Sequence, residues 1–426
     1  MENKFFDTVK AFYFMSVAVL MYYFLNEEIN VGVFVTFRHA FAVVLVFSCF
    51  VSFLVKPDIA RGIVALKSAL VYSIPLLVTI VVSLFIWMTV RADTDIIKRG
   101  LSGAFVYTNM LSFTLAGAAF LYMFGEKGIW YNLAAILTAN IFMIITIIAQ
   151  NGLAGYMSEL VTLVRTFAAE TGDIIVQAEI HELAFCLGAY IIYMALKPKK
   201  NIASAILSVL TVFCFVSAFK RIGIIAVFAA LALGFMLKLI AKFSKRFAFS
   251  FATFLTVLII FILIAYIGII KHNVFEYLEN TGIDTNGRTV IYNAVSKYYT
   301  FSPGYIGKGI GFLTYQLSSN MNVGVSAVHN DFLQYFIDLG FWGYILWLIS
   351  MTLVRVRYFG SEGGCENAIV AFSLLVYLII ASSTDNTMNY PLLTTELAIL
   401  MIGCGFDEKV HTVETKIFGY EGGKTL

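Results

Sequence analysis

The stretch Ala327–Gly343, AVHNDFLQYFIDLGFWG, marks the point where the longest polar segment of the chain gives way to an apolar helix. Asn330 is a favoured N-cap residue and Asp331 follows in the first turn, so we expect a helix to begin here. The free backbone N–H groups and the positive end of the helix dipole at such a terminus favour a bound anion. His329, a residue type that titrates near neutral pH, lies directly beside this terminus.

A polar stripe continues into the same predicted helix. Asp331, Gln334 and Asp338 follow one another at helical spacing, so their side chains share one face. Acidic and amide side chains within an apolar helix are costly beside lipid. We therefore expect this stripe to face a cavity or the interior of a helical bundle.

The composition indicates a membrane protein. The chain has 426 residues, of which 60% are hydrophobic and 13% charged, which excludes an ordinary soluble globular protein. We predict an all-α polytopic fold that forms a single transmembrane domain over residues 1–426. The cysteines form no CxxC pair and no metal-ligand spacing, so we expect neither a disulfide framework nor a metal site.

Apolar runs of roughly 17–25 residues predict about twelve transmembrane helices. We place them near residues 8–25, 31–55, 68–90, 101–124, 129–150, 178–196, 202–218, 222–241, 248–270, 332–354, 366–382 and 391–406. No small-residue cleavage site follows the first run, which we interpret as a retained span. With the N-terminus inside, every inside loop is basic, and Arg61, Lys67 and Arg355 are among the loop residues.

The main extracytoplasmic element is then the long loop 271–331. Asn286-Gly287 marks a turn, and the segment Arg288 to Tyr299 has helical character, so we expect short helices inserted in this loop. A second outside segment, 151–177, contains an amphipathic pattern from Tyr156 to Arg165. That pattern suits a helix that lies at the membrane interface.

Polar residues from separate stretches of the chain meet at the predicted outer face. The topology places there Lys220, Arg221, Arg288, His329, the Asp331/Gln334/Asp338 stripe and Asp385. Cations that converge with a histidine and a helix N-terminus form a site for an anion such as a phosphate or diphosphate.

Each of these residues also has a simpler interpretation. Arg288 suits a bidentate clamp on phosphate oxygens, but also a solvated loop arginine. Lys220 and Arg221 suit contacts with lipid head groups at the mouth of a span, and Asp385 suits a turn. Arg38 lies inside the second predicted span, where it is a binding candidate or the partner of a buried carboxylate.

The motifs resemble the superfamily of O-antigen polymerases (Wzy-type) and O-antigen ligases. The family's HN-x-x-LQ-x-x-x-(acid)-x-G-x-x-G signature is similar to the run of His329-Asn330, Leu333-Gln334, Asp338, Gly340 and Gly343. Its GR…P…GxGxG stretch is similar to Gly287-Arg288, Pro303 and Gly307-x-Gly309-x-Gly311. Its serine–arginine span junction resembles Ser217-x-x-x-Arg221, although Phe219-Lys220 separate residues that are often adjacent there. The resemblance covers about 217–343.

The resemblance implies a membrane-embedded, GT-C-like glycosyltransferase with its active site on the outer face of the bacterial cytoplasmic (inner) membrane. It implies inverting, metal-independent transfer from an undecaprenyl-diphosphate-linked glycan, with no cofactor. Arg221 and Arg288 would hold the diphosphate. His329 would be the general base on the acceptor hydroxyl, oriented by Asp331 or Asp338. Tyrosines of the long loop would stack on sugar rings.

The other candidates are assigned to substrate binding: Lys220, Asn330, Asp331, Gln334, Asp338, Asp385 and Arg38. The expected partners are the lipid bilayer, the lipid-linked glycan as donor and acceptor, and a flippase and chain-length regulator of the same pathway. No nucleic-acid partner is expected.

Three functions remain open from the sequence. A polymerase would join lipid-linked repeat units of O-antigen or capsule, and the leucine-glutamine after the histidine favours it. A ligase would transfer the finished chain to a lipid A-core acceptor and shares the same motifs. A transporter or flippase for lipid-linked sugars would suit about twelve spans, but its site would lie at mid-membrane, whereas the polar groups gather at one face.

Overall fold

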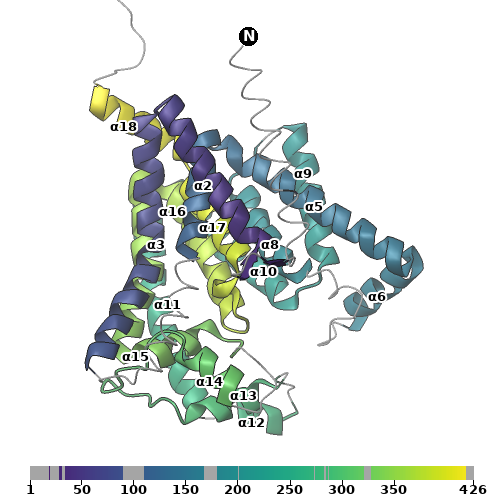
Figure 1. Ribbon diagram of the computed structural model, residues 1–426, viewed down its shortest axis with the longest axis vertical. Helices are drawn as coiled ribbons and strands as arrows, with labels where there is room; N and C mark the ends of the chain where they lie inside the picture. The colour runs from purple at the N-terminus through teal and green to yellow at the C-terminus, as the bar shows by residue number, and fades with distance from the viewer. Residues whose placement is uncertain are drawn as a thin grey trace, which may run out of the picture.

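The computed structural model describes residues 28–30, 34–89, 110–166, 180–199, 201–272, 274–282, 287–320 and 328–418, together with residues 19 and 285. This part of the chain is a bundle of helices (Figure 1). One end of the bundle carries three short helices, α12 (Val274–Asn280), α13 (Arg288–Ser296) and α14 (Phe312–Asn320). We call this end the α12–α14 pole. Helix α18 (Phe406–Phe418) lies at the opposite end.

Five helices of the described part are long and apolar enough to cross a membrane, so the protein is a multi-pass membrane protein. They are α3 (Ile59–Thr89), α5 (Lys127–Asn151), α10 (Arg221–Phe243), α11 (Lys245–Lys271) and the continuous stretch Asp331–Ser382. That stretch consists of α15 (Asp331–Ile349), the π-helix η1 (Ser350–Val354) and α16 (Arg355–Ser382). Shorter apolar helices are Met110–Phe124, α2 (Phe37–Val55), α8 (Ile180–Leu196), α9 (Ile202–Ser217) and α17 (Pro391–Gly403).

The predicted helical membrane fold is confirmed. A helix lies at each predicted span position from the second onward, whereas the first predicted span, 8–25, falls outside the described residues except for residue 19. The total of about twelve spans stays a prediction. The predicted second span begins too early, because β1 (Glu28–Asn30) and β2 (Phe34–Thr36) pair as short antiparallel strands and α2 starts only at Phe37.

Several basic residues that were predicted in inside loops lie on helices, among them Arg61, Lys67 and Arg355. Arg61 and Lys67 belong to the first turns of α3, where Lys67 forms an ion pair with Glu362 at 3.0 Å. Arg355 is buried in the bundle, with its Nε donating to the Tyr72 carbonyl at 3.1 Å and its guanidinium 3.9 Å from the centre of the Tyr72 ring. A guanidinium that has such partners can be accommodated inside a bundle. The helical stretch therefore continues through Arg355, where the sequence predicted a loop.

Small residues allow the central helices to approach closely. A Cβ atom on Gly234 of α10 would lie 2.6 Å from the Ser373 hydroxyl of α16, and one on Gly188 of α8 would lie 2.5 Å from the Tyr377 hydroxyl. Close contacts of this kind are typical of helix packing in membranes. In the same core the Glu396 carboxylate accepts hydrogen bonds from Asn132 and Tyr190.

The predicted interfacial helix in 151–177 is α6 (Leu153–Thr166), which follows α5 away from the bundle (Figure 1). Its Tyr156 and Leu163 are buried, whereas Leu153 and Met157 are exposed. An apolar exposed side beside a buried side suits a helix that lies at a lipid surface.

Helix α15 bends at Gly340, and the glycine-rich stretch before α14 fills the bend. Gly340 has φ 73° and ψ −179°, a conformation that interrupts the helical hydrogen bonds. Segment 305–309 supplies replacements: Gly309 donates to the Asp338 carbonyl at 2.7 Å, and the Tyr305 carbonyl accepts from Phe341 at 2.9 Å. The bend therefore fixes the α12–α14 pole to the transmembrane part of α15.

Replacing Gly340 by alanine tests this junction. A Cβ atom there would overlap the Ile306 carbonyl, and the backbone conformation is one that only glycine adopts readily. We expect Gly340→Ala to lower the free energy of unfolding by at least about 1–3 kcal/mol, measured as a lower midpoint of thermal unfolding in detergent. Gly304→Ala is the control, since its Cβ would find only the Ser302 hydroxyl, at 3.9 Å. Equal midpoints for the two variants would contradict this account of the bend.

Candidate functional site

His329 is held in an unusual conformation at the start of α15. Its φ is 51°, and the only other non-glycine residue of the described part with positive φ is Phe219, which directly precedes Lys220. Backbone strain of this kind collects at functional sites, where the surrounding structure enforces it. The neighbours Val328 and Asn330 are both fully buried, while 45% of the His329 side chain is exposed. The fold therefore anchors the backbone on both sides and leaves the imidazole accessible.

Asn330 acts as the predicted N-cap and also ties three elements together. Its side-chain oxygen accepts from the Leu333 backbone at 3.1 Å, which satisfies one free N–H group of the first turn. Its side-chain nitrogen donates to the Tyr266 hydroxyl of α11 at 2.9 Å and to the Tyr292 hydroxyl of α13 at 3.1 Å. Tyr266 in turn donates to the Ser383 carbonyl at 3.0 Å.

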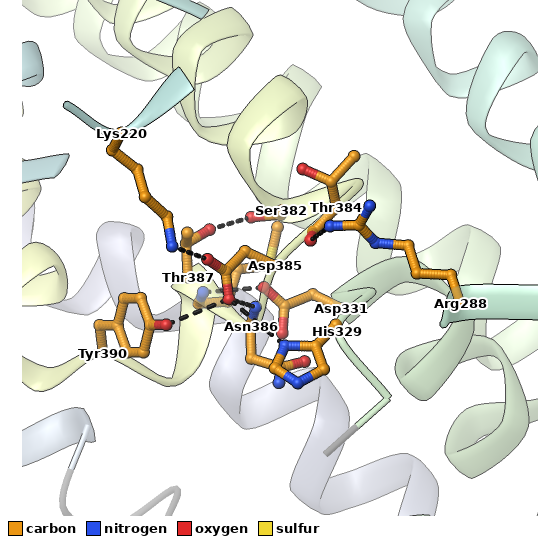
Figure 2. A network of polar contacts seen from close by, with 11 residues as sticks. Lys220, Arg288, His329, Asp331, Ser382, Thr384, Asp385, Asn386, Thr387 and Tyr390 are labelled. Atoms are coloured by element: carbon orange, nitrogen blue, oxygen red, sulfur yellow. Dashed lines mark hydrogen bonds and ion pairs between the residues drawn. The ribbon is translucent and has the colours of Figure 1, made fainter. Parts of the chain in front are cut away.

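Ser383 belongs to segment 383–390, which lies between α16 and α17. We call this segment the Asp385 loop. Lys220 Nζ lies 3.0 Å from Asp385 Oδ2, and His329 Nδ1 lies 3.7 Å from Asp385 Oδ1. Oδ1 also accepts from the Asn386 backbone at 2.8 Å and from the Tyr390 hydroxyl at 3.1 Å. Figure 2 shows Asp385 at the centre of this network.

The Asp385 carboxylate is charged in spite of its burial. Only 9% of its side chain is exposed, and burial alone would raise its pKa. The contacts with His329 and Lys220 and the backbone N–H of Asn386 outweigh burial and hold the pKa of Asp385 below its ordinary value of 3.8. The loop therefore presents a fixed negative charge between a lysine and a histidine.

Arg288 approaches the same loop from α13. It follows Gly287, whose φ of 72° forms the turn into α13, and its Nη2 donates to the Thr384 carbonyl at 2.8 Å. Its Nε is buried without a hydrogen-bond partner, so the guanidinium retains capacity to donate. Figure 2 shows Arg288 and Lys220 reaching the loop from different directions.

The predicted acidic stripe divides between two tasks. Asp331 is fully buried and accepts from the Met388 backbone at 2.8 Å, so it supports the Asp385 loop. Gln334 lies 3.5 Å from the Thr314 hydroxyl, and Asp338 Oδ1 accepts from the Leu313 backbone at 3.3 Å at the start of α14. These two residues hold the glycine-rich stretch and α14 rather than the Asp385 loop.

The structure records a different acidic neighbour for His329. Asp331 and Asp338 were the expected partners, and the structure shows them accepting from the backbones of Met388 and Leu313. Asp385, expected as a substrate ligand, is the acidic residue whose ion pair with His329 the structure records. Sequence spacing cannot predict this contact, because the two residues lie on separate elements.

The remaining two predicted basic residues, Arg221 and Arg38, are described by their positions on the helices. Arg221 is half-buried at the first position of α10, next to Lys220. Arg38 lies in the first turn of α2, but its side chain is outside the described part of the structure.

Sequence reasoning missed several residues of the network. Tyr266 was hidden inside an apolar span, and Tyr390 and Thr384 gave no pattern at all. Tyr292 had been expected to stack on sugar, yet it is buried and packs edge-on against Phe275 with 4.8 Å between ring centres. A polar group within an apolar run, such as the Tyr266 hydroxyl, was the one signal available.

A family model described as O-antigen ligase matches residues 206–348. About one third of the chain is thus similar to this family. The match agrees with the superfamily that the sequence motifs resemble and supports an O-antigen polymerase or ligase that acts on lipid-linked glycans. The comparison with curated proteins found no match.

The matched region contains only part of the network. Lys220, Arg288 and His329 lie within residues 206–348, whereas the Asp385 loop lies beyond them. Among the described residues, no group of three or more histidine, cysteine, aspartate or glutamate side chains is arranged to hold a metal ion.

The ionised state of Asp385 predicts a pH-dependent stability. A carboxylate whose pKa is lowered by folding stabilises the protein above pH 4, and this contribution is lost as the pH falls through the lowered value. We expect Asp385→Asn to lower the free energy of unfolding at pH 7 by about 2–3 kcal/mol, somewhat less than for a fully buried pair. Below about pH 4 the difference from the wild type should shrink, measured by chemical unfolding across pH.

The control for this titration is Asp58→Asn. Asp58 pairs with Arg61 at 3.6 Å, but both side chains are at least one-third exposed. Exposed pairs contribute at most about 1 kcal/mol. A stability difference for Asp385→Asn that stays constant down to pH 3 would contradict the assigned charge.

Proposed function

We propose that the protein is a polymerase of O-antigen or capsular polysaccharide that joins lipid-linked repeat units. The observation that carries this proposal is the convergence of Lys220, Arg288 and His329 on the single loop of Asp385. Two cations and a histidine around one ionised carboxylate suit transfer of a sugar from a diphosphate to a hydroxyl. The match to the family model supports the same class of reaction.

The cations provide the diphosphate site. Lys220 directly precedes α10 and Arg288 begins α13, and both contact the Asp385 loop. Arg221 adds a third positive charge beside Lys220. Positive groups that are already in place where charge develops stabilise the transition state, so these side chains hold the donor and neutralise the departing diphosphate.

His329 is the general base in this proposal, and Asp385 positions it. A carboxylate beside Nδ1 favours the tautomer that carries its proton there. Nε2 is then the nitrogen with a free electron pair, directed away from Asp385. With nearly half of its side chain exposed, His329 can meet an acceptor hydroxyl.

The chemical step follows from these positions. The acceptor hydroxyl oxygen attacks the anomeric carbon of the donor sugar from the side opposite the diphosphate, and His329 takes the hydroxyl proton at Nε2. The bond from the anomeric carbon to the phosphate oxygen breaks, and its electron pair leaves with the diphosphate. The configuration at the anomeric carbon inverts. The basic side chains supply the positive charge that the departing diphosphate requires.

The location of the site completes the proposal. The α12–α14 pole lies at the outer face of the bacterial inner membrane, where an undecaprenyl-diphosphate-linked donor can reach the cations while its hydrocarbon chain stays in the bilayer. A GT-C-like arrangement of about twelve spans would carry this pole. A flippase and a chain-length regulator are the expected partners of the pathway.

Leu333 and Gln334 favour a polymerase over a ligase. Both belong to the first turns of α15, where Leu333 receives the Asn330 cap and Gln334 contacts α14. The description of the family model, O-antigen ligase, keeps the ligase as the second candidate. A surface-glycan analysis separates the two activities.

Deleting the gene tests the function. We expect surface glycan that stops at one repeat unit, with no long ladder on a gel, because repeat units can no longer be joined. Long polymer that stays on undecaprenyl diphosphate, with bare lipid A-core, would instead indicate the ligase. Repeat units that accumulate on the cytoplasmic leaflet would replace both with a transporter.

Two substitutions test the site in the complemented strain. His329→Ala should lower polymer formation by about 10²–10⁴-fold, since it removes the base. Arg288→Ala should lower it by about 10²–10³-fold, since it removes a charge that stabilises the leaving group. Both proteins should still fold and insert. The controls are His411→Ala and Arg357→Ala, because both residues are exposed and lie outside the network. Normal polymer from His329→Ala or Arg288→Ala would refute the site.

A further inference from the structure

The contacts of the Asp385 carboxylate are unequal. Oδ2 pairs with Lys220 at 3.0 Å, and Oδ1 accepts from the Asn386 backbone at 2.8 Å and the Tyr390 hydroxyl at 3.1 Å. The distance from Oδ1 to His329 Nδ1 is 3.7 Å, longer than the 2.7–3.2 Å of a normal N–H···O hydrogen bond. His329 therefore has the longest contact of the four partners.

Lys220 and His329 reach Asp385 from opposite sides (Figure 2). The lysine side chain is 25% exposed and the histidine side chain 45%, whereas Asp385 is only 9% exposed and is fixed by its own loop and by Tyr390. The lysine and the histidine, which belong to other elements than the loop and have access to solvent, are thus the partners able to move.

The charges around Asp385 make these two partners competitors. The single negative charge of Asp385 faces both the Lys220 ammonium and the His329 imidazole. When Lys220 neutralises that charge, the electrostatic attraction between Asp385 and His329 becomes weaker. Other charged or titratable groups of the neighbourhood include Arg221 at the start of α10, Arg288 on α13, Asp331 on α15, Tyr390 before α17 and Glu182 on α8.

We propose that Lys220 and His329 share Asp385, and that a donor diphosphate, by taking Lys220, releases Asp385 to His329. The base then becomes stronger only once a donor is bound, so the acceptor hydroxyl loses its proton with the sugar already in place. This inference rests on the proposed function for the identity of the anion. It assigns to Lys220 a regulatory role in addition to binding.

The experiment follows the protonation of the His329 ring by NMR. The full-length protein is labelled at its five histidines and placed in lipid nanodiscs, and the His329 signal is identified by its loss in His329→Ala. The probe is undecaprenyl diphosphate without sugar. We expect the probe to raise the titration midpoint of the ring by about one pH unit in the wild type, because a carboxylate that closes on an imidazole favours the charged ring.

Variants separate the release of Asp385 from the direct field of the diphosphate. Lys220→Met should show the raised midpoint without the probe, and Lys220→Arg, which retains the competing charge, should behave like the wild type. Asp385→Asn should abolish the response to the probe. In the double variant Lys220→Met/Asp385→Asn the rise caused by Lys220→Met should disappear, which excludes simple loss of a neighbouring cation.

Two results would overturn the inference. One is an unchanged wild-type midpoint with the probe bound, and the other is an equal rise in Asp385→Asn, which would assign the effect to the diphosphate alone. If Asp385→Asn does not fold, Lys220→Met and Lys220→Arg still test the inference. Equal titration midpoints of the His329 ring in these two variants would exclude a carboxylate shared by Lys220 and His329. The titration midpoint of the His329 ring is measured without polymer synthesis. A failure of this inference can therefore be distinguished from a failure of the proposed function.

Discussion

The buried negative charge of Asp385 is the constraint around which the α12–α14 pole is built. A carboxylate taken out of water costs several kcal/mol unless charged or hydrogen-bonding partners replace the solvent. Here the partners come from the turn before α10, the turn before α15 and the loop itself. Two of those turns contain the non-glycine residues with positive φ, Phe219 and His329. The strain at both turns and the charge at the centre thus support one another, because each turn delivers a side chain to the same carboxylate.

A second constraint connects this centre to the membrane part of the protein. Gly340 opens α15 two residues beyond the polar stripe, and the glycine-rich stretch fills the opening with backbone hydrogen bonds. Asp338 completes the junction through the start of α14. The first turns of α15, which directly follow His329 and Asn330, are therefore held by backbone hydrogen bonds as well as by side-chain packing. A misplacement of about 1 Å can cost a large factor in rate, so such a junction suits the general base proposed at His329.

Hydropathy predicted the helices well, because burial in lipid leaves a continuous apolar signal of the right length. It failed where polar groups are satisfied inside the bundle: Arg355 was predicted in a loop, yet the Tyr72 carbonyl and ring accommodate it. The cap at Asn330 was predictable from local chemistry. The contact between His329 and Asp385 was not, since it joins two elements through a turn that has no periodic pattern. The role of Tyr266 was not predictable either. In the sequence its hydroxyl is one polar group in an apolar run, whereas in the structure it links Asn330 to Ser383.

The way charges are satisfied distinguishes the interior of the bundle from its pole. Arg355 is held by a backbone carbonyl and a ring, and Glu396 by Asn132 and Tyr190, all of them buried. Such groups are fixed in one arrangement, which suits helix packing better than the binding and release of a substrate at mid-membrane. At the pole, Lys220 and His329 are partly exposed and meet on one shared carboxylate. A charge with two accessible partners can be redistributed by an anionic ligand, whereas a charge with only buried partners cannot. This difference favours an enzyme that works at one face of the membrane over a transporter that works through its centre.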